Sequence, residues 1–197
     1  VVSRGTAGMI FEVVARAPRA ARVRVEIEAL GRHSVQNALA AAAVGLVAGV
    51  PDEAIAAGLG GPWGRASAHR GAVVEAPGLT ILDDTYNASP GAVVAALEVL
   101  ATLPGRPVAV LGEMLELGAL HERGHREVGA AAARVAAELV VVGAVAAGIA
   151  DGAAGAGLAP GRIHRAPDRD AALAILREIL RPGDAVLVKA SRGAALE

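Results

Sequence analysis

The sequence predicts an α/β protein, most of it a mostly parallel, Rossmann-like sheet with helices on both faces. Strand-like and helix-like patterns alternate with short connections from about residue 70 onward, which is typical of such sheets. The preceding region shows a hairpin pattern followed by two helical patterns. Between the two regions, glycine and proline in residues 60–64 interrupt both periodicities and predict a linker. We therefore expect two domains, 1–63 and 64–197.

The expected elements follow in chain order. Residues 1–28 alternate apolar and polar side chains and predict a hairpin, and helical spacing over 34–49 and 51–59 predicts a pair of helices. Residues 152–161 are rich in glycine and alanine and are expected to be a flexible connector. The other expected strands are 72–75, 79–83, 108–111, 139–142, 163–165 and 186–189, and the other expected helices are 90–102, 121–136, a short one ending near 150, and 168–180 capped by Asp168.

Composition limits the possible functions. The formal net charge of −1 over 197 residues gives no broad attraction to nucleic acid. The longest apolar run, 139–150, is shorter than the roughly 20 residues of a membrane-spanning helix.

The absence of cysteine excludes disulfides and thiolate metal sites. With no secretory signal at the start, we expect a cytoplasmic protein. Because residue 1 is Val rather than Met, we expect a portion of a longer chain.

Polar residues follow three of the predicted strands. Residues 83–87 (Asp-Asp-Thr-Tyr-Asn) follow the first of these strands, Gly112 and Glu113 follow the second, and residues 189–192 close the last one. Parallel sheets bind ligands at the carboxyl ends of their strands. We therefore expect the three clusters to lie together on one rim of the sheet.

The acidic cluster has a plain structural explanation beside a functional one. One of Asp83 and Asp84 could form an Asx turn while the other lies in solvent. Alternatively, a carboxylate here could accept hydrogen bonds from the hydroxyl pair of a ribose. Tyr86 is the only tyrosine of the chain, and its place beside two acids favours stacking on a ligand or donating to it over core packing.

Lys189 is the only lysine of the chain, whereas arginine is abundant. Lysine offers a compact charge on a flexible stem, which suits an anion, although a lysine at a strand end could also simply face water. Arg192 adds positive charge at the start of a predicted terminal helix for which Ser191 is the expected cap. An anionic ligand group is therefore the favoured interpretation.

A loop bounded by glycines, Gly112–Gly118, contains two acids. Glycine permits unusual backbone angles, so this loop could reach over the rim and place Glu113 or Glu116 against a ligand ammonium. Equally, Leu115 and Leu117 could anchor the loop while both glutamates lie in solvent.

Several motifs are absent. His121 and His125 share a helix face, but no acid or cysteine completes a metal set, and we predict no metal site. A Walker loop needs Gly-Lys-Ser/Thr, whereas the sole lysine lies between Val188 and Ala190. The dinucleotide motif GxGxxG and the serine-hydrolase motif GxSxG are also missing.

Five ordered stretches resemble the Mur ligase family over nearly the whole chain. They are residues 31–41 (similar to G-x-H-N-x-x-N-x-x-A-A), Arg65 (similar to the arginine that enters the C-terminal domain), 82–90 (similar to L-D-D-x-Y-N-A-N-P), 110–118 with His125 and 128–129, and 187–192. The last two stretches are most similar to the members that add D-alanyl-D-alanine. Ser34 and Ser89 stand where the family pattern has asparagine, and Ala190 where it has glycine.

The resemblance implies a domain assignment and a reaction. Residues 1–63 would be the C-terminal part of the central ATP-binding domain, and 64–197 the Mur ligase C-terminal domain. The reaction would join D-alanyl-D-alanine to UDP-N-acetylmuramoyl-tripeptide in peptidoglycan precursor synthesis, through an acyl phosphate, with ATP and Mg²⁺. The Walker loop and magnesium ligands of the family are not in this chain, so we assign it no catalytic or metal-binding residue. We expect it to be inactive alone, and monomeric.

The resemblance also implies contacts for individual residues. Asn37 would contact adenine, and Arg65 and Asp84 would hold the ribose and phosphates. The residues expected to line the cleft for D-alanyl-D-alanine are Tyr86, Asn87, Glu113, Lys189, Ser191 and Arg192.

Two other functions stay open. One is a related ligase that adds a diamino acid, lysine or folate-linked glutamate; an amino-acid-adding relative would be expected to carry a D-N-P-R or similar arginine motif, which this sequence lacks. The other is a non-catalytic nucleotide-binding α/β module, whose nucleotide binding would be coupled to a protein partner rather than to ligation.

Overall fold

The computed structural model describes residues 1–3, 5–61 and 69–196. The chain forms two compact units, Val1–Ala68 and His69–Glu197. The predicted boundary between residues 63 and 64 lies outside the described residues and stays a prediction. Within the described residues, no helix is long and apolar enough to cross a membrane.

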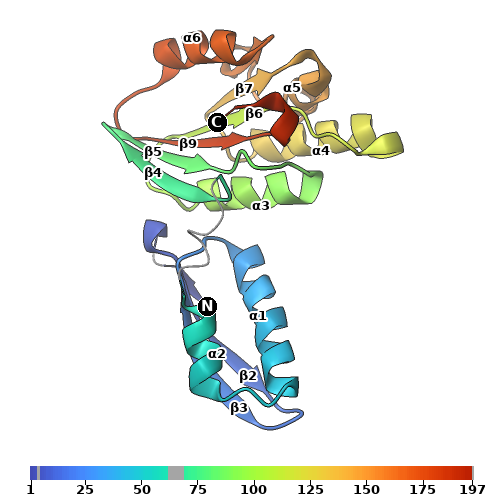
Figure 1. Cartoon of the computed structure of the whole chain (residues 1–197). Coiled ribbons are helices and arrows are strands. Elements are labelled where there is room, and N and C mark those ends of the chain that lie inside the picture. The colour runs from blue at the N-terminus through green and yellow to red at the C-terminus, as the bar shows by residue number, and fades with distance from the viewer. Residues whose placement is uncertain (4, 62–68, 197) are drawn as a thin grey trace. The chain divides into compact units, whose positions relative to one another are not determined.

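The first unit is an antiparallel sheet with two helices packed on it (Figure 1). Its sheet has the order β1-β2-β3. Alternate side chains of β3 are buried, as the period of two predicted, and they form one core with the buried residues of β2 and the helices. The elements are β1 (Val2–Ser3), β2 (Met9–Ala15), β3 (Ala21–Ile27), α1 (Arg32–Val47) and α2 (Asp52–Leu59). The hairpin and both helices are confirmed, and the short strand β1 is an addition.

The second unit is built on a six-stranded sheet of order β4-β5-β9-β6-β7-β8. The pair β4 and β5 is antiparallel, and every other neighbouring pair is parallel. The mostly parallel sheet predicted from the alternating pattern is thereby confirmed. The strands are β4 (Ala72–Ala76), β5 (Leu79–Asp83), β6 (Pro107–Leu111), β7 (Glu138–Val142), β8 (Ile163–Ala166) and β9 (Asp184–Lys189).

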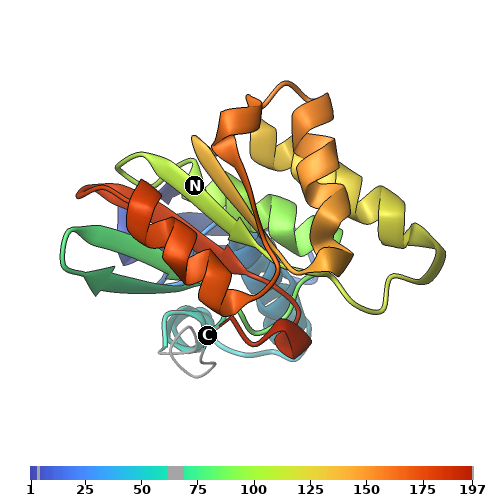
Figure 2. The same cartoon turned by 90° about the horizontal axis from the view of Figure 1, so that it is seen from above.

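Helices cover both faces of this sheet. The connections from β5 through β8 advance in one direction along the sheet, whereas the connection from β8 to β9 returns. Because such crossovers are right-handed, the returning helix α6 (Arg169–Ile179) lies on the face opposite the others (Figures 1 and 2). It packs on the valines of the central strands, including Val108 and Val140. The other three helices are α3 (Pro90–Leu100), α4 (His121–Ala133) and α5 (Ala147–Gly155).

Two glycines allow α4 and α5 to approach each other closely. A Cβ atom on Gly129 would overlap the carbonyl oxygen of Ile149, and one on Gly152 would overlap the carbonyl oxygen of Arg126. The flexible connector predicted for 152–161 is therefore partly wrong, because α5 continues to Gly155. Gly152, the first of its small residues, serves tight helix packing rather than flexibility.

The predicted helix at the end of the chain is also wrong. Up to residue 196, where the described part ends, β9 is followed by a short 3₁₀ turn, Arg192–Ala194, and by no α-helix. Ser191 makes no side-chain cap there, and its hydroxyl oxygen instead accepts a hydrogen bond from the backbone N–H of Leu115 at 2.9 Å. The cap predicted at Asp168 is confirmed, since its Oδ1 accepts from the N–H of Ala171 at 2.8 Å.

A buried ionic cluster joins the strands at the amino-terminal edge of the same sheet. Arg106 donates to both carboxylate oxygens of Asp184, at 3.0 and 2.8 Å, and to Glu138 at 3.1 Å. Arg162 and His164 also contact Glu138. The side chains of Asp184 and Glu138 are only 3% and 7% exposed. This cluster ties β9, β6, β7 and β8 together at the edge opposite the candidate site.

Candidate functional site

The three predicted polar clusters lie on one rim of the second unit. The strand β9 lies between β5 and β6 and is parallel to both, with Asp83 beside Val188 and Leu111 beside Lys189. The carboxyl ends of these strands therefore meet. Two backbone hydrogen bonds extend the pairing past the strand ends, from Asp84 N–H to the carbonyl of Val188 and from Gly112 N–H to the carbonyl of Lys189, both 3.0 Å long.

Lys189 is buried at the centre of this rim, with 2% of its surface exposed. Its ammonium donates to Asp84 Oδ2 at 2.5 Å, to the Asn87 carbonyl at 2.9 Å and to the Asp84 carbonyl at 3.4 Å. The alternative of a lysine facing water is wrong. In this conformation all three N–H groups of the ammonium donate to acceptors within the chain, so Lys189 holds the acidic turn in place. Direct contact between Lys189 and a ligand stays a prediction.

Asp83 has the Asx-turn role that the sequence allowed for one of the two acids. Its Oδ1 accepts from the N–H and the hydroxyl of Thr85, at 3.2 and 2.8 Å, and its Oδ2 lies 2.7 Å from Nδ1 of His69. Both side chains are 21% exposed, but both oxygens of Asp83 are engaged, whereas Lys189 engages only Oδ2 of Asp84. Of the two acids, Asp84 is therefore the one suited to a ligand hydroxyl.

The glycine-bounded loop is fixed at its Met114, which is fully buried. The N–H of Met114 donates to Nε2 of His125 on α4 at 3.0 Å. At the β9 end, the N–H of Ser191 donates to the carbonyl of Glu113 at 2.9 Å. Of the two leucines considered as anchors, Leu115 is 43% exposed and Leu117 is partly buried. Fixed on both sides, the loop holds the partly exposed Glu113 at the rim.

His125 is a neutral acceptor in this arrangement. Its Nε2 accepts from Met114, so Nδ1 carries the proton and donates to the carbonyl of His121 at 2.7 Å. The ring is 1% exposed, and burial, which disfavours the charged form, lowers the pKa of His125 below 6.5. Protonation would remove the acceptor that anchors the loop.

This geometry predicts a loop that loosens as pH falls. Because the folded-state pKa of His125 is depressed, its stabilising contribution is complete above about pH 6.5 and is lost as pH falls toward the folded value. His125→Leu should cost about 1–2 kcal/mol, since it leaves a buried N–H unpaired. The check is the hydrogen-exchange protection factor of the Met114 amide between pH 7.5 and 5.

His121→Gln is the matched control, because it keeps the carbonyl that His125 contacts. It should retain the pH dependence of Met114 protection, whereas His125→Leu should abolish it. Equal pH dependence in the wild type and in His125→Leu would contradict this role for His125.

Tyr86 lies at the outer side of the rim with 38% of its surface exposed. The Arg70 guanidinium carbon stacks 3.6 Å from the ring centroid, and that of Arg192 lies 5.8 Å away. Hydrogen bonding and charge from Arg70, and then the charge of Arg192, lower the pKa of the Tyr86 hydroxyl. The ring is thus a platform for two cations, in a loop rather than in the core.

Sequence reasoning missed His69 and Arg70, although a signal was present. The strands β4 and β5 are separated by Pro77-Gly78, a turn pair that predicts a hairpin. In a hairpin the start of the first strand lies beside the end of the second, as Ala72 does beside Asp83. Residues just before β4 therefore belong to the carboxyl rim.

One predicted site residue, Asn37, belongs to the first unit, where it is exposed on α1. Arg65 lies outside the described residues. The contacts of both with a nucleotide stay predictions. Among the rim residues, Asn87 contributes its carbonyl to Lys189, and its own side-chain oxygen accepts from the N–H of Ala88 at 2.9 Å.

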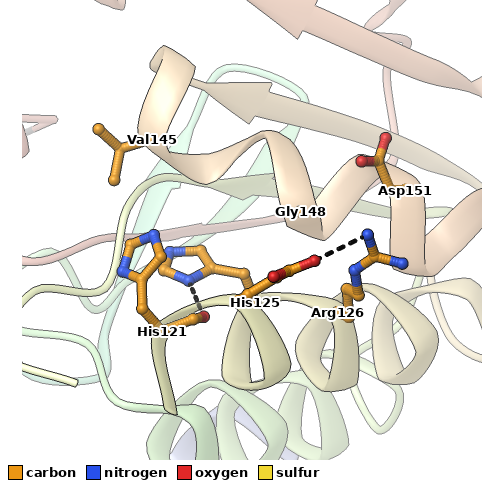
Figure 3. Close-up of a pocket in the computed structure, with 7 residues that line it drawn as sticks. His121, His125, Arg126, Val145, Gly148 and Asp151 are labelled. Atoms are coloured by element: carbon orange, nitrogen blue, oxygen red, sulfur yellow. Dashed lines mark hydrogen bonds and ion pairs between the residues drawn. The ribbon is translucent and has the colours of Figure 1, made fainter. Parts of the chain in front are cut away.

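The histidine pair considered for a metal lines a small pocket where α4 and α5 begin (Figure 3). The two ring centroids are 4.3 Å apart, and Nδ1 of His125 is engaged by a carbonyl oxygen. Arg126 and Glu122, also at this pocket, pair with each other at 3.0 Å. Within the described residues, no group of three or more His, Cys, Asp or Glu side chains could hold a metal ion.

The sequence matches one protein family and is similar to curated members of it. Residues 69–192 match the family described as Mur ligase, glutamate ligase domain. The UDP-N-acetylmuramoyl-tripeptide--D-alanyl-D-alanine ligases of Mycobacterium leprae and Bacillus subtilis are 39% and 37% identical, over 94% and 87% of this chain. The alignments cover 39% and 38% of those relatives. The chain thus spans about two fifths of the length of the curated relatives it matches.

Two solved structures with similar folds are also of MurF ligases. A crystal structure of MurF from Acinetobacter baumannii is similar over 96% of this chain and 40% of its own, with a TM-score of 0.80 and 26% identity. The MurF ligase from Thermotoga maritima in complex with ADP is similar over 98% of this chain and 45% of its own, with a TM-score of 0.70 and 25% identity.

Proposed function

The chain belongs to the Mur ligase family, and we propose that it supplies adenosine and amino-substrate contacts to a ligase that joins D-alanyl-D-alanine to UDP-N-acetylmuramoyl-tripeptide. The observation that carries this proposal is the rim on which Asp84, Lys189 and Glu113 are held by one network of hydrogen bonds. The similarity to ligases named for this reaction supports the choice of substrates. We propose a cytoplasmic reaction, where ATP is available.

The residues present fit an adenosine group. Asp84 is held by Lys189 through one carboxylate oxygen, so its other oxygen can accept from a ribose hydroxyl. Its fixed position lowers the entropy cost of that contact. The described residues do not fit a magnesium ion, since no group of acids converges on one point. The magnesium and phosphate chemistry is therefore assigned to parts of the ligase other than these residues.

The amino substrate fits the other half of the rim. The amine must arrive uncharged at the carbon it attacks, so the substrate ammonium has to lose a proton after binding. Glu113 is partly exposed at the loop and can accept a hydrogen bond from that ammonium. The peptide group after Glu113 is fixed because its N–H donates to His125 and its carbonyl accepts from Ser191, which orients the bound amine.

Calorimetric titration of the chain with D-alanyl-D-alanine tests the amino-substrate half of the proposal. We expect saturable binding of this dipeptide and none of L-lysine or of a diamino acid at the same concentration. Glu113→Gln should weaken dipeptide binding about tenfold, because it removes a charge-assisted hydrogen bond. Binding of a single amino acid in preference to the dipeptide would assign the chain to a different ligase of the family.

A second expectation concerns ATP. The sole lysine lies between Val188 and Ala190, so no Gly-Lys-Ser/Thr run is available to hold phosphates. We expect the 197-residue chain alone to release no phosphate from ATP above the uncatalysed background, measured by a coupled phosphate assay. Turnover that disappears in Asp84→Asn would contradict this expectation.

A further inference from the structure

Ser191, just after β9, forms hydrogen bonds with the loop Gly112–Gly118 in both directions. Its backbone N–H donates to the carbonyl of Glu113, and its hydroxyl oxygen accepts from the N–H of Leu115, both at 2.9 Å. Ser191 is 3% exposed, so water is poorly placed to replace either partner. A serine hydroxyl buried in this way is a specific partner for the backbone of the loop.

Apolar contacts join the same two segments. A Cβ atom on Gly112 would lie 3.2 Å from Cδ1 of Leu196. One on Gly193 would lie 3.2 Å from Cδ1 of Leu115. The residues that follow Ser191 therefore pack closely against the loop to which Ser191 is bonded, and this packing keeps the two hydrogen bonds in a poorly solvated place.

The next residue of the loop, Glu116, has a left-handed backbone with φ +62°. Among the described residues, eleven glycines but only three other residues have a positive φ, so the chain usually places glycine at such positions. A residue with a side chain keeps this conformation only where its surroundings fix it. The hydrogen bonds of Ser191 act on residues just before Glu116 and supply part of that constraint.

We propose that Ser191 is a positioning residue for the amino substrate, which holds the backbone of Glu113 in the conformation that binds the dipeptide; this inference rests on the proposed function. A loop that is not held must be ordered when the dipeptide binds, and this ordering weakens the affinity. Direct contact between Ser191 and the dipeptide is the alternative. The two roles differ in one respect, because positioning acts only through Glu113.

The test is calorimetric titration of the 197-residue chain with D-alanyl-D-alanine, together with hydrogen exchange of the Leu115 amide. Ser191→Ala removes the hydroxyl and keeps the backbone N–H. It should weaken dipeptide binding about fivefold and speed exchange of the Leu115 amide about tenfold. Ser191→Thr retains a hydroxyl, so wherever it restores Leu115 protection it should also restore affinity.

A double-mutant cycle with Glu113→Gln distinguishes positioning from direct contact. In the Glu113→Gln background, Ser191→Ala should cause no further loss of affinity, because the charge that Ser191 positions is absent. Thr102→Ala is the matched control. It removes a 2.7 Å hydrogen bond from the Thr102 hydroxyl to the carbonyl of Val99, just past the end of α3, and should leave dipeptide affinity unchanged.

The outcomes that would overturn the inference differ in what else they affect. Unchanged affinity or unchanged Leu115 exchange in Ser191→Ala removes the positioning role and leaves the proposed substrate intact. An equal loss of affinity in the wild-type and Glu113→Gln backgrounds replaces positioning with direct contact. Failure of the wild-type chain to bind the dipeptide removes the inference and the proposed amino substrate together.

Discussion

Replacing Arg106 with Leu should lower the free energy of unfolding by about 3–5 kcal/mol, the cost of removing one partner from a buried ion pair. Arg106 makes a two-point contact with Asp184 and a further contact with Glu138. Both carboxylates are almost completely buried, so without the guanidinium Asp184 loses its main partner, and Glu138 loses one of three, in a poorly solvated place. Urea unfolding of the wild type and the variant at pH 7 measures the effect.

Lowering the pH should reduce this difference. Hydrogen bonding to Arg106 lowers the pKa of Asp184. Burial acts to raise the pKa of Glu138, but hydrogen bonds from His164 and Arg162 outweigh burial, so the pKa of Glu138 is also lowered. Depressed carboxylate pKa values stabilise the fold above the usual values of 4.5 and 3.8, and that stabilisation is lost as pH falls through the folded-state values. In Arg106→Leu these acids can protonate more readily.

The control for Arg106 is Arg123→Gln on the surface of α4. Arg123 pairs with Glu127 four residues on, but both side chains are mostly exposed, so the loss should be below about 0.5 kcal/mol. A loss in Arg106→Leu no larger than in Arg123→Gln, or one independent of pH down to 3, would contradict the structural role of the cluster.

Lys189→Met should cost about 3 kcal/mol of stability, because it removes charge-assisted hydrogen bonds to Asp84 and Asn87. Methionine fills a similar volume, so loss of packing is small. The same change should abolish detectable dipeptide binding, since the acidic turn is no longer tied to β9. Thermal or urea unfolding and calorimetry on the same samples give the two readouts.

A double-mutant cycle separates the interaction energy of the ion pair from the other destabilising effects of each substitution. Asp84→Asn combined with Lys189→Met should be about 1–2 kcal/mol less destabilised than the sum of the single variants, because the remaining unpaired charge is gone. Arg192→Met, an exposed cation three residues on, should change stability by less than about 0.5 kcal/mol. Strict additivity of the two site variants would show that Asp84 and Lys189 do not act as a pair.

The sequence predicted the elements because their signals are local. The period of two in β3 and the cap at Asp168 depend on neighbours only a few residues away, and both are found in the structure. The rule that ligands bind at the carboxyl ends of parallel strands was enough to expect Asp84, Glu113 and Lys189 on one rim. A resemblance carried by five ordered motifs supplied the family.

The tertiary structure decided which atoms each of these residues contacts. The sequence favoured an anionic ligand group as the partner of Lys189; in the structure the carboxylate of Asp84, 105 positions earlier, accepts a hydrogen bond from its ammonium. In one of the two interpretations, Leu115 and Leu117 anchored the glutamate loop, whereas the hydrogen bond between the buried Met114 and His125 holds it. No local pattern reports such partners, because they are set by which strands become neighbours.

The sequence by itself thus determined the fold class, the order of the elements and the rim on which polar residues gather, because hydrophobic periodicity and strand direction are properties of short segments. Only the tertiary structure decided which charges neutralise one another. The strand β9 enters the sheet between β5 and β6, and the antiparallel β4 brings Arg70 to the same rim. Charge pairing depends on distances across the sheet, and those distances exist only once the strands have assembled.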